Sequence, residues 1–162
     1  MEKVKITAKD FDKDKNYVGD MNISDRFNPF DGSVEIEENL GYVKFKALHV
    51  KGSIVVKAGS GISAGSGISA GWGISAGWGI SAGSGISAAY YSIKAKLSIK
   101  INAKCAIVAG IFNSDGPQDV EASEIDGNVV YGNKKIIPAE LVEKKIVRVK
   151  TKDGTVVEGE IV

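Results

Sequence analysis

The sequence predicts an all-β protein, a parallel β-solenoid wound from six-residue repeats. Three observations predict it: the hexads, the glycines within them, and the alternation of apolar and polar side chains. From residue 56 to residue 91 the chain repeats hexads of the type ISAGSG or ISAGWG. A period of six is even, so every repeat presents the same side chains to the same face of an extended strand. A helix is a poor alternative, because two glycines per hexad cost about 1 kcal/mol each. The pattern is typical of a stacked β-coil.

Within each hexad, isoleucine and alanine share one side of the strand, and serine points to the other. Some forty residues of this alternation exceed the length of a single strand, since strands usually have about 3–10 residues. The glycine after each alanine is the natural corner, because glycine adopts unusual backbone angles without penalty. We therefore expect short strands joined by glycine corners, with isoleucines stacked inside the coil.

The same alternation continues on both sides of the perfect hexads. Residues 93–107 alternate apolar with polar side chains, but the inward positions have moved from even to odd numbers across residues 90–92. One extra residue there indicates a bulge or an altered corner. A second shift is expected between Ala47 and Val50. These limits define a predicted solenoid body over residues 41–112.

The two ends of the chain have a different composition and are expected to cap the solenoid. Residues 1–40 form a polar N-terminal segment, and residues 113–162 form a C-terminal cap. The expected elements in these caps are strands at 3–7 and 128–131, a short helix at 138–144, and a hairpin of strands 146–151 and 155–161 around Asp153-Gly154. A solenoid exposes unpaired backbone at both ends, which is the reason for expecting such caps.

Composition excludes several functional classes. No apolar run approaches the roughly 18 residues of a membrane helix, and no secretory signal is visible, so a cytoplasmic location is expected, with the virion as an alternative. A single cysteine, Cys105, lies on the inward parity and is expected to be a buried small residue. The acidic stretch after Asp10 is not an EF-hand, since Tyr17 and Ile23 replace its required glycine and glutamate. We expect no cofactor and no metal site.

Charge is segregated along the chain although the net charge is only +1. Residues 1–42 carry a net charge of −4, residues 43–112 one of +8 without a single acid, and residues 113–162 one of −3. The lysines bracket the uncharged hexads and could form basic stripes that bind a polyanion. The alternative is that they solubilise the coil or pair with the acidic terminal segments.

Aromatic side chains are the other candidate for binding. They occupy the position after the corner glycine, where a narrow coil has no internal room for them. If these aromatic side chains are exposed on an uncharged face, they form an interaction patch. The alternative is that they fill the space between the solenoid and the terminal segments. The candidate binding residues are therefore Trp72, Trp78, Tyr90, Tyr91, Lys94, Lys96, Lys100 and Lys104.

The hexads, with the later segments IVAGI at residues 107–111 and GNVVYG at residues 127–132, resemble a loose group of phage and prophage proteins with I-x-A-G-x-x repeats. That resemblance spans roughly residues 33–133, and it implies a source and a fold rather than an activity. A more distant resemblance is to hexapeptide-repeat left-handed β-helix proteins, some of which are acyltransferases. Trp72 and Trp78 depart from that pattern, so the handedness of the coil stays open.

These observations favour a non-enzymatic phage-type interaction protein whose rigid solenoid faces a host protein or a protein–nucleic acid complex. Inhibition of a host defence or of a nucleic-acid-processing complex is one form of this hypothesis, and direct nucleic-acid binding by the lysines is a variant. The alternative is a spike, fibre or filament built as a homo-oligomer. A hexapeptide acyltransferase is the third hypothesis and would need His49 as its base, without an obvious carboxylate to orient it. No catalytic residue is predicted.

Overall fold

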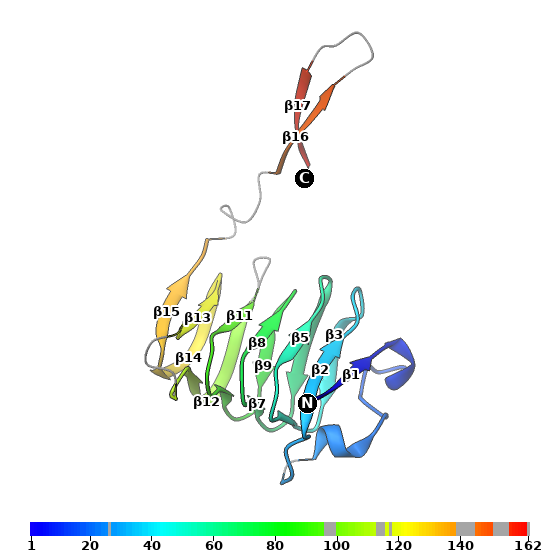
Figure 1. Ribbon diagram of the computed structural model, residues 1–162, viewed down its shortest axis with the longest axis vertical. Coiled ribbons are helices and arrows are strands. Elements are labelled where there is room, and N and C mark those ends of the chain that lie inside the picture. The colour runs from blue at the N-terminus through cyan, green and yellow to red at the C-terminus, as the bar shows by residue number, and fades with distance from the viewer. Residues whose placement is uncertain are drawn as a thin grey trace.

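The computed structural model describes residues 1–25, 27–95, 100–112, 116, 118–138, 145–150 and 156–161. Within these residues the regular structure is almost entirely β, and the strands from β1 to β15 lie side by side along one axis (Figure 1). The strands of this stack are β1 Glu2–Ile6, β2 Gly32–Ile36, β3 Gly41–Phe45, β4 Leu48–Val50, β5 Ile54–Val56, β6 Ser60–Ala64, β7 Ile68–Ala70, β8 Ile74–Ala76, β9 Ile80–Ala82, β10 Ile86–Ala88, β11 Ile93–Ala95, β12 Lys100–Ala109, β13 Asp119–Ala122, β14 Glu124–Tyr131 and β15 Asn133–Ile136. The predicted parallel β-solenoid is confirmed.

The coil has three faces, and one turn takes three hexads. The first face is the sheet β1-β2-β5-β8-β11-β13-β15. The second face contains β3, β6, β9 and the start of β12, and the third contains β4, β7, β10 and the end of β12, so the long β12 joins the two. All of these pairs are parallel and in register: Ile62 pairs with Ile80, and Ile68 pairs with Ile86.

Isoleucine and alanine fill the interior as expected. Every isoleucine and every alanine of the hexad strands is buried, while the serine between them is only half-buried on the outside. Isoleucines of successive turns are register partners, as in the row Ile54–Ile74–Ile93 of the first face. Each fully buried isoleucine contributes about 1.5–3 kcal/mol of hydrophobic stabilisation, so the repeat itself supplies the core.

The corners lie at the glycine-containing segments between strands, where the backbone of one turn bonds to that of the next. The N–H of Trp72 donates to the carbonyl of Gly52 (3.1 Å). The predicted irregularity at residues 90–92 is a corner with one residue more than its neighbour below. The backbone N–H groups of Tyr90 and Tyr91 both donate to the carbonyl of Trp72 in the turn below (3.4 and 3.2 Å), which accommodates the additional residue.

The solenoid strands extend beyond residues 41–112 on both sides. β1 and β2 precede this range on the first face, β13 and β15 follow it on the same face, and β14 pairs with β12. Between β1 and β2, the short 3-10 helices η1 (Ala8–Asp10) and η2 (Met21–Ser24) belong to a segment that bridges the free edges of β3 and β4, through Asn16 and Phe30.

The C-terminal hairpin forms a sheet of its own. β16 (Lys145–Lys150) and β17 (Val156–Ile161) pair antiparallel, with Lys145 opposite Ile161, which confirms the predicted hairpin. The helix predicted over residues 138–144 lies outside the described residues after Pro138.

Candidate functional site

One corner of the solenoid gathers exposed aromatic side chains. This corner, between the third and first faces, is formed in successive turns by residues 71–73, 89–92 and 110–112, none of which is charged. We call its exposed apolar residues the aromatic edge: Trp72, Tyr90, Tyr91, Ile111 and Phe112. Trp72 is 50% exposed and Phe112 is 70% exposed, so these large side chains face solvent rather than the core.

Backbone stacking and ring contacts together position the aromatic edge. The rings of Trp72 and Tyr91 have centroids 5.9 Å apart, and so do those of Tyr90 and Phe112. The N–H of Phe112 donates to the carbonyl of Ala89 (2.9 Å), which anchors the last turn of the corner on the previous one. The rings therefore follow one another along the corner from turn to turn.

Trp78 lies at a different corner from the other predicted aromatics. Because one turn takes three hexads, neighbouring hexads point to different corners, and residues three hexads apart, such as Trp72 and Tyr90, come together. Trp78 is half-buried beside Tyr42, with ring centroids 6.0 Å apart. The structure thus brings together three of the four aromatic candidates and separates the fourth.

The predicted lysines are held by acids of the adjacent turn. Lys94 pairs with Glu121 (3.1 Å), its register partner on β13. Lys100 pairs with Glu124 (2.9 Å) and with Asp126 (3.0 Å), and these hydrogen bonds raise the pKa of Lys100 above its ordinary value. Acidic residues of β13 and β14 therefore compensate the charges of Lys94 and Lys100.

The remaining lysine candidates have no described contacts. Lys96 lies outside the described residues, and Lys104 lies on β12 without a described side chain. Upstream, Lys51 pairs with Asp31 (3.3 Å) and Lys57 with Glu35 (3.7 Å), which repeats the same neutralisation at the other end of the stack.

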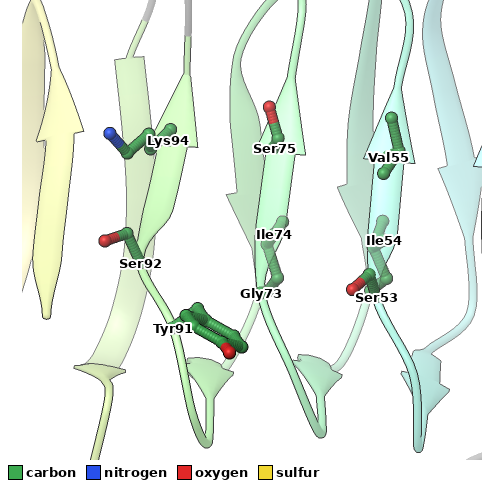
Figure 2. Close-up of a pocket in the computed structure, with 9 residues that line it drawn as sticks. All are labelled: Ser53, Ile54, Val55, Gly73, Ile74, Ser75, Tyr91, Ser92 and Lys94. Atoms are coloured by element: carbon green, nitrogen blue, oxygen red, sulfur yellow. The ribbon is translucent and has the colours of Figure 1, made fainter. Parts of the chain in front are cut away.

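A hollow of about 290 Å³ opens on the first face beside the aromatic edge. Figure 2 shows the ring of Tyr91 at one end of it and a row of Val55, Ser75 and Lys94 on neighbouring strands at the other. Its floor is the backbone of the hexad strands, including that of Ile54 and Ile74, whose side chains point into the core. Mostly apolar and next to exposed rings, the hollow can accept a nonpolar side chain of a partner.

His49, the residue considered as a catalytic base, lies away from the aromatic edge. His49 is half-buried on β4, in register with Ser69. The nearby carboxylate of Asp25 accepts hydrogen bonds from the N–H of Phe27 (2.8 Å) and the amide of Asn28 (3.0 Å) instead, and these bonds lower the pKa of Asp25. In the described part of the chain, no cluster of three or more histidine, cysteine and acidic side chains could hold a metal ion.

Sequence reasoning missed Ile111 and Phe112 at the aromatic edge and Tyr42 beside Trp78. All three lie outside the perfect hexads, so the repeat did not mark them. Counting two turns of three hexads from Tyr42 leads to Trp78, so the repeat period would have aligned these two rings.

Comparison with known proteins finds no matching family model, no matching curated protein and no matching solved structure. Over the described residues, no helix has the length and the apolar character needed to cross a membrane.

Proposed function

We propose that this protein is a non-catalytic interaction protein that docks a protein partner, such as a host macromolecule, through the aromatic edge. The observation that carries the proposal is the gathering of Trp72, Tyr90, Tyr91 and Phe112 on one uncharged corner. Tryptophan and tyrosine are the residues most enriched at the energetic centres of interfaces. The adjoining apolar hollow supplies a concave site next to these convex rings.

The charge pattern supports a protein partner over a nucleic acid. Phosphate binding needs lysines whose charge is free, and it makes affinity fall steeply with salt. Lys94 and Lys100 are tied to three carboxylates of the next turn. The residues that form the corner itself, 71–73, 89–92 and 110–112, carry no charge, which favours an interface formed mainly by apolar contact.

A fibre or filament of stacked solenoids is the alternative function, and both ends of the coil argue against it. The N-terminal segment bridges the free edges of β3 and β4. At the other end, Lys134 stands in the inward row after Val120, where a stacking partner would require an apolar residue.

Affinity capture with edge variants tests the proposed function. A lysate protein that binds the wild-type chain should be lost on capture with a Trp72→Ser/Phe112→Ser double variant. Phe27→Ser is the matched control, because Phe27 is 82% exposed away from the edge and its removal should leave capture unchanged. Capture that is equal for the double variant and the wild type would exclude the aromatic edge as the docking surface.

A further inference from the structure

The second face carries another hollow, of about 370 Å³, away from the aromatic edge. It crosses four stacked strands, β3, β6, β9 and β12. Its lining residues are Tyr42, Lys44, Ser63, Ser81, Lys100 and Asn102. This hollow combines an aromatic ring, neutral polar groups and two lysines, whereas the hollow beside the aromatic edge has one lysine.

Tyr42 forms a platform at this site. A Cβ atom on Gly61 would lie only 2.9 Å from Cε1 of Tyr42, so the ring lies across the bare backbone of that glycine. Trp78 supports it from the adjacent corner, at a centroid distance of 6.0 Å. Tyr42 remains 40% exposed, which leaves ring surface available for stacking.

A row of neutral polar groups runs beside the platform. Ser63, Ser81 and Asn102 are successive register partners on β6, β9 and β12. Parallel strands are about 4.8 Å apart, a spacing comparable with the length of one sugar ring. As far as the described residues extend, none of these three side chains has a hydrogen-bond partner in the protein, so all are available to a ligand.

The lysines at the two ends of the row differ in charge balance. Lys100 is compensated by Glu124 and Asp126. Lys44, the register partner of Ser63, makes no ion pair with the described residues, although Asp12 lies near enough to feel its charge. The Lys44 end of the row therefore attracts a single negative charge. The Lys100 end is flanked by the carboxylates of Glu124 and Asp126 and repels a densely charged polymer.

We propose that this hollow binds an acidic oligosaccharide. The nonpolar C–H face of a sugar ring stacks on Tyr42, the sugar hydroxyls bond to Ser63, Ser81 and Asn102, and a sugar carboxylate lies at Lys44. Hydroxyl and amide groups both donate and accept hydrogen bonds, as sugar hydroxyls require. A single-stranded nucleic acid fits less well, because it brings one phosphate per nucleotide towards Glu124 and Asp126.

Titration calorimetry on the full chain tests this inference with hyaluronan oligosaccharides of several lengths, which carry only one carboxylate for every two sugars. At least one length should bind more tightly than a neutral malto-oligosaccharide. Tyr42→Ala should weaken that binding about tenfold, the order of loss expected when a stacking ring is removed. Lys44→Gln should abolish the preference for the acidic over the neutral probe.

Two serines from strands with the same Ile-Ser-Ala sequence provide the matched control. Ser81→Val on the second face should weaken binding several-fold, while Ser87→Val on the third face, with the same isoleucine and alanine neighbours, should leave it unchanged. The inference is overturned if none of the hyaluronan oligosaccharides binds better than the neutral probe, if Ser81→Val and Ser87→Val behave alike, or if oligothymidylate binds the same site more tightly.

Discussion

At the scale of single residues, the same hexad position meets different surroundings on different turns. Gly65 and Gly71 both follow the alanine of their hexad. A Cβ atom on Gly65 would have its nearest neighbour, the carbonyl oxygen of Lys46, at 3.6 Å, which is ordinary contact. A Cβ atom on Gly71 would clash with the carbonyl oxygen of Lys51. The glycines of the repeat are therefore unequal in their structural importance.

We expect Gly71→Ala to lower the free energy of unfolding by about 1–3 kcal/mol, because the backbone of the turn below must move to relieve the clash. Gly65→Ala should be neutral or stabilise by up to about 1 kcal/mol, because alanine restricts the unfolded chain. Urea unfolding of both variants checks this pair. Equal destabilisation of the two variants would mean that the corners need glycine for a reason other than the close approach of the backbone in the turn below.

At the scale of elements, the last strands of the first face are tied together by a carboxylate. Asp119 of β13 accepts a hydrogen bond from Nζ of Lys135 (2.8 Å), while its N–H donates to Oγ of Ser92 (3.0 Å) on the previous turn. The ammonium group of Lys135 lowers the pKa of Asp119 below its ordinary value of 3.8. The charged form of this residue is therefore the one that the fold stabilises.

The lowered pKa of Asp119 makes its contribution dependent on pH. Stability from this carboxylate is complete above the unfolded pKa of 3.8 and is lost as the pH falls through the lower folded pKa. Asp119→Asn should therefore lower the thermal midpoint at neutral pH, and the difference from the wild type should shrink below about pH 4. Thermal scans at several pH values check this, and a constant difference would contradict it.

At the scale of the whole molecule, the solenoid has a definite end. Val120 is fully buried in an inward row of the first face, and its register partner in β15 is Lys134. The Lys134 ammonium bends to the carbonyl of Ile125 (3.5 Å). An inward-pointing charge is a known means of preventing edge-to-edge association of sheets.

Lys134→Ile should therefore make the protein associate end to end, because it extends the apolar row to the open edge of β15. Light scattering should show a wild-type chain of single size and a larger, concentration-dependent species for the variant. Lys57→Ile adds the same side chain at a corner away from the end and should not associate. Association of both variants alike would show only a general loss of solubility.

The hexads by themselves determined the parallel strands, the inward isoleucines and alanines, the outward serines and the corner glycines. These features follow from a local pattern, the even period and the glycine positions, and they needed no knowledge of distant contacts. The sequence also predicted the irregular corner at Tyr90 and Tyr91, because one additional residue moves every later side chain to the opposite face of its strand.

Only the tertiary structure decided which residues meet, because the number of hexads in one turn depends on how the coil closes. Three hexads per turn place Tyr91 beside Trp72 and leave Trp78 with Tyr42. The same stacking sets Glu121 against Lys94, so two charges that are far apart in the sequence compensate each other in space. Side chains outside the repeat, such as Phe112, enter the aromatic edge only through this closure.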